Sequence, residues 1–293
     1  MHMMELPTTS PSDANRRSFA LDSSRPSASS HTNYQPYRPS TNDASDRPFY
    51  GAVDPSYLPG GEKSLSGISI RSFLLGQATG ICTILTFLLY ASSTLWRIPF
   101  FIASLAVFHF LEYYITARYN TTFATITAFL LSQNGAAYNI AHSSAIVESL
   151  LSHLFLPTWY FEWTAAMFGG RKYQVMLGLG LMVVGQVVRS LAMAQAGVSF
   201  THTIQHQRRD EHQLIKNGIY SIFRHPSYFG FFWWGLGTQL VLGNAVCFVG
   251  YAVVLWEFFS TRIQKEEQLL IGFFGKEYDD YRSKTWVGIP GIS

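Results

Sequence analysis

The sequence predicts an all-α integral membrane protein with about six transmembrane helices, preceded by a disordered N-terminal tail. Only 13% of the 293 residues are charged, whereas soluble domains usually carry about 25%. The charges are also unevenly distributed, because 13 of the 39 lie in residues 1–68 and only eight lie between Ser72 and Gly197. Long apolar runs fill most of the remaining chain. A surface made of such runs could not face water, so a soluble protein is excluded.

Residues 1–68 are rich in Ser, Pro, Asn and Asp and have no sustained apolar period. Such a segment cannot bury enough apolar surface to offset the entropy of ordering, so we expect a disordered cytosolic tail. It has no basic start followed by a long apolar core, and we do not expect a secretory signal peptide. Residues 60–64 resemble a phosphate-binding loop only superficially, because Glu62 stands where the second glycine should be.

Six apolar runs after the tail approach the roughly 20 residues that cross a bilayer. They are 72–92, 97–117, 137–156, 173–196, 226–242 and 245–261. The last two form a tight hairpin through Gly243 and Asn244. Six spans place both chain ends on one side, together with the basic segments 198–225 and 262–293. By the positive-inside rule, we expect this side to be cytosolic, along with both termini and the glycosylation sequon at Asn120.

Glycines in two of the spans are candidates for helix packing. Gly76 and Gly80 make a GxxxG, which either allows close helix approach or is incidental in a membrane helix. The run from Gly178 through Gly180 to Gly185 could be mistaken for a dinucleotide-binding loop. It lies inside an apolar span with no strand before it, so helix packing is the better interpretation.

Five ionisable residues fall inside the predicted spans, where a charge is costly. One interpretation is that they pair with one another or with backbone groups and fix helix packing. The alternative is that some of them line a polar route to a buried site. The five are His109, Glu112, His142, Glu148 and Arg189.

Polar residues concentrate just before the fifth span. His202 and His206 are spaced i, i+4 and could bind a metal on one helical face. No histidine box of the HxxHH type accompanies them, so we expect no metal site. Pro226 begins the span at the position where its missing N–H costs nothing. Arg224 and His225 then flank a helix N-terminus, whose free N–H groups favour an anion.

Arg262 and Glu266 lie four residues apart where the last span leaves the membrane, so they share a helical face. The simplest interpretation is an intrahelical ion pair, which contributes only a few tenths of a kcal/mol. The alternative is a site for a zwitterionic ligand, since a cationic group beside an acidic one suits both ends of such a molecule.

The order and spacing of motifs over about residues 201–292 resemble one protein family. The motifs are His212-Gln-Leu-Ile-Lys-Asn-Gly218-Ile-Tyr220, Arg224-His-Pro-Ser-Tyr228, Gly237-Thr-Gln239 with Asn244, Arg262-Ile-Gln-Lys-Glu266-Glu267, Phe274-Gly275, Tyr278, Tyr281 and Gly288-Ile-Pro290. This pattern is similar to that of the isoprenylcysteine carboxyl methyltransferases, integral membrane enzymes of the endoplasmic reticulum. Single motifs also occur in other membrane methyltransferases and sterol reductases, whereas their combination is more specific. Ala245 departs from the family, which usually has Pro after the Asn, and this puts the hairpin geometry in doubt.

The resemblance implies methyl transfer from S-adenosyl-L-methionine to the C-terminal carboxylate of a prenylated cysteine after CaaX processing. Residues 69–293 would form the membrane domain, with a cytosolic C-terminal catalytic segment at about 201–292. By motif position the cofactor site would comprise Gln205, His212, Gln213, Leu214, Ile215, Tyr220, His225, Pro226, Ser227, Tyr228 and Glu266. Arg262 would bind the substrate carboxylate, which makes Arg262 and Glu266 the expected catalytic residues.

The expected partners are prenylated CaaX proteins and the lipid bilayer, with the chain placed as a multi-pass protein in the endoplasmic reticulum membrane. A net charge of +3 is too small and too dispersed to argue for nucleic acid. Two alternatives stay open. One is a related membrane enzyme, such as a phospholipid methyltransferase or an NADPH-dependent sterol reductase. The other is a non-catalytic membrane scaffold or transporter.

Overall fold

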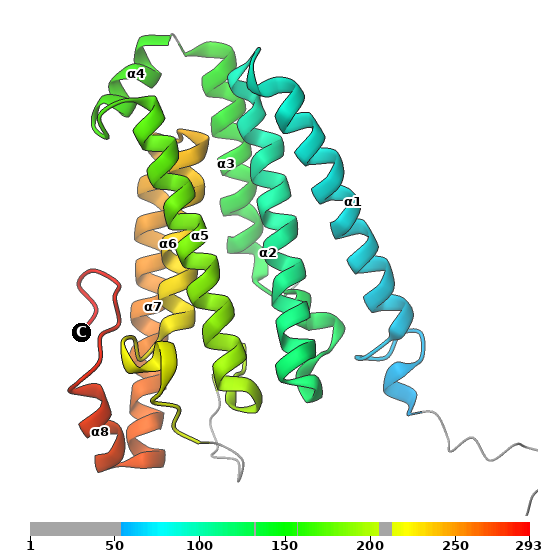
Figure 1. Cartoon of the computed structure of the whole chain (residues 1–293), viewed down its shortest axis with the longest axis vertical. Helices are drawn as coiled ribbons and strands as arrows, with labels where there is room; N and C mark the ends of the chain where they lie inside the picture. The colour runs from blue at the N-terminus through cyan, green and yellow to red at the C-terminus, as the bar shows by residue number, and fades with distance from the viewer. Residues whose placement is uncertain (1–53, 132, 157, 205–212) are drawn as a thin grey trace, which may run out of the picture. The chain divides into compact units, whose positions relative to one another are not determined.

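The computed structural model describes residues 54–131, 133–156, 158–204 and 213–293. This part of the chain is built from helices and contains no β-strand (Figure 1), so the predicted all-α class is confirmed. The α-helices are α1 (Leu65–Tyr90), α2 (Arg97–Tyr119), α3 (Gly135–Phe155), α4 (Thr158–Ala166), α5 (Arg171–Ala196), α6 (Pro226–Leu242), α7 (Ala245–Phe274) and α8 (Lys276–Arg282). Short 3-10 turns join several of them.

Each predicted span coincides with a helix, but the described residues contain four helical segments that are long and apolar enough to cross a membrane. These are Leu65–Tyr90, Thr94–Tyr119, Arg171–Ser199 and Ala245–Phe274. The helices α3 and α6 are not among them, and α6 has only 17 residues. The structure therefore shows a helical protein with at least these candidate spans, and six crossings stay a prediction.

Two helix boundaries differ from the predicted ones by more than two residues. The first helix begins at Leu65 rather than at residue 72, because the Ser64 hydroxyl caps it by accepting the N–H of Gly67 at 3.2 Å. This start and the turn Pro55–Tyr57 lie within the stretch predicted as tail, while residues 1–53 lie outside the described residues. The last long helix extends beyond the predicted span 245–261 to Phe274, so Arg262 and Glu266 lie on this helix as their spacing predicts.

Glycines bring α5 and α6 into close contact, side by side in Figure 1. A Cβ added at Gly178 would lie 2.8 Å from the carbonyl oxygen of Gly237, and one at Gly185 would lie 2.5 Å from that of Gly230. The two backbones therefore approach more closely than any side chain allows. The helix-packing interpretation of the Gly178–Gly185 run is confirmed. By contrast, a Cβ at Gly76 or Gly80 would meet nothing within 4 Å, so those two glycines mediate no packing among the described residues.

The hairpin between α6 and α7 forms although Ala245 replaces the family's proline. Gly243 takes a φ of 77°, which a glycine adopts without strain. The buried Asn244 then donates to the carbonyl of Ala145 in α3 at 2.9 Å and to the side chain of Gln239 at 3.0 Å. Side-chain hydrogen bonds therefore fix the turn that proline would otherwise stiffen.

Most ionisable groups inside the spans are paired, as the packing interpretation predicts. Glu148 caps α7 by accepting the backbone N–H groups of Val246 and Cys247 at 2.9 and 2.6 Å. The Glu112 carboxylate in α2 holds the Arg189 guanidinium of α5 through two hydrogen bonds. The two imidazoles also have backbone partners: His109 contacts the carbonyl of Phe129, and His142 contacts that of Tyr138, each at 2.8 Å. Glu148 and the Glu112–Arg189 pair thus join different helices, whereas the His142 contact lies within α3.

We predict that Gly185→Ala destabilises the protein by about 1–3 kcal/mol, because the new methyl group overpacks the α5–α6 contact. Gly180→Ala is the matched control. It lies on the same helix, and its Cβ would have nothing within 4 Å. Because alanine favours a helix over glycine, the control should stay neutral or gain up to about 1 kcal/mol. Thermal unfolding of both variants in detergent measures the difference, and equal stabilities would contradict the packing role.

Candidate active site

A cavity lies where α5 ends and α6 begins, beside the polar second half of α7. Its empty space is about 880 Å³, part of which is open to the surroundings. Nine of the predicted cofactor residues line it: Gln213, Leu214, Ile215, Tyr220, His225, Pro226, Ser227, Tyr228 and Glu266. The other two, Gln205 and His212, lie outside the described residues, as does His206 of the considered metal pair. The structure thus brings together residues that are up to 53 positions apart in sequence.

The first turn of α6 forms one wall of this cavity. Pro226 is the first helical residue, and its missing N–H leaves no donor unsatisfied there. The rings of His225 and Tyr228 stack with centroids 5.5 Å apart. The helix points its positive end at the cavity, so this wall favours an anionic ligand group.

Arg262 and Glu266 do not form the intrahelical ion pair that their spacing predicts. The hydroxyl of Tyr228, from the neighbouring α6, links them instead. Arg262 Nε donates to Tyr228 Oη at 2.8 Å, and Tyr228 Oη donates to Glu266 Oε2 at 2.6 Å. Because the tyrosine occupies the space between them, the guanidinium and the carboxylate are held in place as separate charges. Arg262 also donates to the carbonyl oxygen of His202.

Arg224 binds Glu267, and it does not offer its charge to an anionic ligand at the start of α6. Its Nε donates to Glu267 Oε1 at 2.6 Å, and its Nη1 donates to the carbonyl of Thr285 at 2.8 Å. The His225 Nε2 atom also lies 3.3 Å from the same carboxylate oxygen. Both members of the Arg224–Glu267 pair are buried. The guanidinium is therefore neutralised, and it fixes the Arg-His-Pro segment to α7 and to the C-terminal loop instead of offering a free cation at the helix start.

Tyrosines from the turn before α6 and from α8 also line the cavity. The Tyr281 hydroxyl of α8 donates to the carbonyl oxygen of Tyr220 at 2.7 Å, which holds the turn η6 (Gly218–Ser221) against α8. Burial raises the pKa of Tyr220, Tyr278 and Tyr281 above its ordinary value, so all three stay neutral. Gly218 has a φ of 59° and packs against the Gln195 side chain, so this turn requires a glycine.

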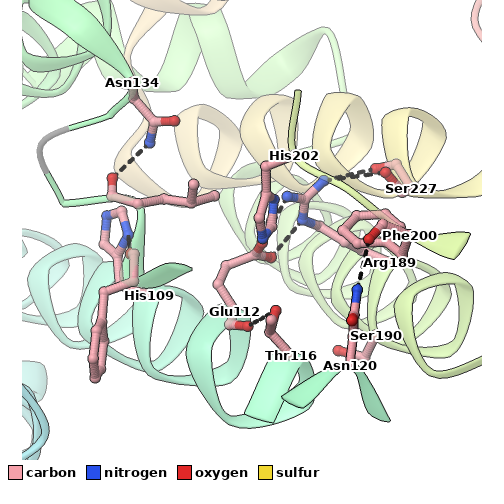
Figure 2. A network of polar contacts seen from close by, with 12 residues as sticks. His109, Glu112, Thr116, Asn120, Asn134, Arg189, Ser190, Phe200, His202 and Ser227 are labelled. Atoms are coloured by element: carbon pink, nitrogen blue, oxygen red, sulfur yellow. Dashed lines mark hydrogen bonds and ion pairs between the residues drawn. The ribbon is translucent and has the colours of Figure 1, made fainter. Parts of the chain in front are cut away.

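The segment after α5 forms the rim of the cavity and is anchored from α2 (Figure 2). Asn120, which follows α2, donates its Nδ2 atom to the carbonyl of Phe200 at 2.8 Å and is buried. Phe200 and Thr201 line the cavity. Two residues on, burial lowers the pKa of His202 to about 4, so this imidazole is neutral at neutral pH. The nitrogen that a glycan would modify in the sequon is thus already engaged.

Several residues that line the cavity were not predicted from the sequence. Leu269, Leu270 and Phe273 follow Glu266 at i+3, i+4 and i+7, and they line the cavity with it. This spacing marks one face of a helix, so continuing the helical face of Arg262 and Glu266 beyond residue 266 could have found them. The pairing of Arg224 with Glu267 left no such signal, because it depends on how α6 and α7 are rotated relative to each other.

Comparisons with known proteins agree with the motif resemblance. The profile of the isoprenylcysteine carboxyl methyltransferase family matches residues 176–272, from α5 almost to the end of α7. A protein-S-isoprenylcysteine O-methyltransferase of Saccharomyces cerevisiae is 44% identical over 229 residues, which cover 78% of this chain and 92% of the relative. The enzyme of that name from Homo sapiens is 37% identical over 77% of this chain and 75% of its own length.

A solved structure, described as the eukaryotic intramembrane Ras methyltransferase of this kind, has a TM-score of 0.68 and 31% sequence identity, with 77% of each chain covered. The apolar helices and the polar cavity at their ends define a membrane enzyme. The relatives specify its class as a methyltransferase. The chain belongs to the isoprenylcysteine carboxyl methyltransferase family.

Proposed function

We propose that this chain methylates the C-terminal carboxylate of prenylated cysteine in processed CaaX proteins, with S-adenosyl-L-methionine as the donor. The names of the relatives support this reaction. The structural observation that supports this reaction best is the hydrogen-bonded chain from Arg262 through Tyr228 to Glu266. The guanidinium lies one helical turn from the carboxylate, and this supports a cation for an anionic acceptor beside an acid that suits the ammonium of the donor.

The residues of the cavity fit such a donor. Glu266 offers a carboxylate to the ammonium group, and the start of α6 at His225 and Pro226 suits the donor's carboxylate. Further along α7, Leu269 and Phe273 offer the kind of apolar surface on which an adenine ring can pack. The set therefore accommodates a ligand that is zwitterionic at one end and flat and aromatic at the other. When bound, the sulfonium supplies an activated methyl group.

The acceptor needs orientation more than activation. A C-terminal carboxylate has a pKa of about 3.5 and is ionised at neutral pH, so no general base is required. Correct alignment of two reactants can contribute about 7–11 kcal/mol to the barrier reduction. The guanidinium of Arg262 can hold a carboxylate through its planar fork, and Tyr228 and the His202 carbonyl fix its direction.

An apolar surface beside Arg262 suits the prenyl chain of the acceptor. Phe258 lies one turn earlier on α7, and its ring centroid is 5.9 Å from the guanidinium carbon of Arg262. The ring is 52% exposed. In a bilayer this face of the helix would meet lipid, so a lipid-linked substrate could approach Arg262 along it.

We propose an endoplasmic reticulum location with both termini in the cytosol. The segments 198–225 and 262–293, which build the cavity, hold nine Lys and Arg residues, in agreement with the positive-inside rule. A tag placed after Ser293 should be removed by protease added to sealed microsomes. Protection of the tag would overturn this orientation.

Incubating membranes that contain the protein with methyl-labelled S-adenosylmethionine and N-acetyl-farnesylcysteine tests the proposed function. We expect label in a base-labile methyl ester. Phosphatidylethanolamine serves as the competing acceptor in a parallel incubation. Label that enters only the lipid would favour a phospholipid methyltransferase instead, and label in neither acceptor would reject both activities.

Substitutions in α7 should separate the two binding roles. Arg262→Ala should raise the KM for the prenyl acceptor by about 10- to 100-fold, and Glu266→Ala should raise the KM for the donor by a similar factor. Each change removes about one charge-assisted hydrogen bond. Lys265→Ala and Glu257→Ala are matched controls, because both side chains are exposed on the same helix. Initial rates with each substrate varied in turn measure the KM values, and wild-type values in both variants would refute the assignment.

A further inference from the structure

A buried ion pair links α2 and α5, and neither of its residues lines the cavity or has a role in the proposed function (Figure 2). Glu112 of α2 is 1% exposed and Arg189 of α5 is 6% exposed. Arg189 Nη2 donates to Glu112 Oε2 at 2.7 Å, and its Nε donates to Oε1 at 2.5 Å. The guanidinium also packs against the rings of Phe108 and Phe231, each 5.4 Å away. Its position is therefore fixed from several sides.

The remaining nitrogen of Arg189 reaches the wall of the cavity. Nη1 lies 3.2 Å from the carbonyl oxygen of Ser227 and 3.4 Å from its hydroxyl. Ser227 lies in the first turn of α6, the wall that faces the carboxylate end of the proposed donor. The ion pair thus determines where this helix start sits relative to α2 and α5.

The Glu112 carboxylate also lies near His202, which accepts a hydrogen bond from Arg262, the residue proposed to bind the acceptor. His202 Nδ1 is 3.8 Å from Glu112 Oε2, and the carbonyl oxygen of His202 accepts a hydrogen bond from Arg262. The Glu112 carboxylate therefore forms hydrogen bonds with Arg189 and lies next to, but does not hydrogen-bond, the His202 ring. Through Arg189 it leads to the donor end of the site, and through His202 it leads to the acceptor end.

We propose that Glu112 and Arg189 are positioning residues for methyl transfer, which keep the helix start at Ser227 and the guanidinium of Arg262 in a fixed mutual arrangement. This inference rests on the proposed function. Transfer requires the acceptor oxygen, the methyl carbon and the sulfur to be aligned, and a misplacement of about 1 Å can cost about 100-fold in rate. A buried ion pair gives little net stability over an apolar pair of similar volume, whereas its geometry is strict.

Replacing the whole pair separates positioning from stability. In the double variant Glu112→Leu, Arg189→Met no buried charge is left alone, so thermal stability should stay near that of the wild type. We expect the KM for S-adenosylmethionine to rise and kcat to fall, each by about tenfold or more. Arg189→Lys is the second variant. It keeps the charge beside Glu112 but lacks the planar fork, so we expect donor KM to rise while the protein stays folded.

Glu148→Gln is the matched control, because Glu148 is another acid within the helices whose partners, Val246 and Cys247, lie 16 and 15 residues before Arg262 on α7. It should lower the unfolding temperature and leave KM and kcat unchanged. Binding of S-adenosylhomocysteine, measured by calorimetry, gives a readout that does not need turnover.

The outcomes distinguish failure of the proposed function from failure of the positioning role alone. A wild-type protein that neither binds S-adenosylhomocysteine nor methylates farnesylcysteine would overturn the proposed function. A wild type that does both, with wild-type constants in the double variant and in Arg189→Lys, would overturn the positioning role alone. Unfolding of both variants would make the pair a requirement of the fold and would also reject that role.

Discussion

The close contact between α5 and α6 is the constraint on which the cavity depends. Glycines at 178 and 185 face glycines at 237 and 230, so the two helix backbones touch and their register is fixed. This register brings Arg189 next to Gly230 and within reach of Ser227. It also sets the end of α5 beside the turn at Tyr220, whose hydroxyl donates to the carbonyl of Ala192. The cavity is formed between these two helix ends, so its shape follows from packing in the apolar part of the protein.

The Tyr228 hydroxyl keeps Arg262 and Glu266 from forming a direct ion pair. Two opposite charges four residues apart on a helix tend to neutralise each other. With the phenol between them, each keeps one hydrogen bond to the same oxygen and presents its remaining atoms elsewhere. The adjacent pair of Arg224 and Glu267 uses the opposite strategy, because direct contact neutralises both charges. The neighbouring acids Glu266 and Glu267 therefore differ in the charge state of their surroundings, because Tyr228 in α6 binds one and Arg224, just before α6, binds the other.

Much of the helical framework could be predicted from the sequence. Runs of apolar residues located the six longer helices, although the first begins earlier and the last ends later than the predicted spans, and the order of motifs identified the family and nine residues that converge on one cavity. The end of the last long helix was harder to predict, because hydropathy falls after residue 261 while the helix continues to Phe274. The short helix α4 was not predicted. Its nine residues contain no complete apolar span.

Contacts between helices were beyond prediction from spacing. The sequence places Arg262 and Glu266 on one face, but only the rotation of α6 against α7 decides that Tyr228 enters between them. The same holds for Glu112 and Arg189, which are 77 residues apart. Spacing along one helix reports its faces, whereas the choice of partner across a helix interface depends on tertiary packing.

The buried amide of Asn120 bears on whether the sequon can be glycosylated. Its nitrogen, the atom to which an oligosaccharide would be joined, is hydrogen-bonded to Phe200 and shielded by the rim of the cavity. Attachment of a sugar chain would leave one N–H on that nitrogen, but Asn120 is only 3% exposed and has no room for a sugar. Burial of the amide and the proposed cytosolic side of this segment therefore lead independently to the same expectation, that Asn120 carries no sugar chain.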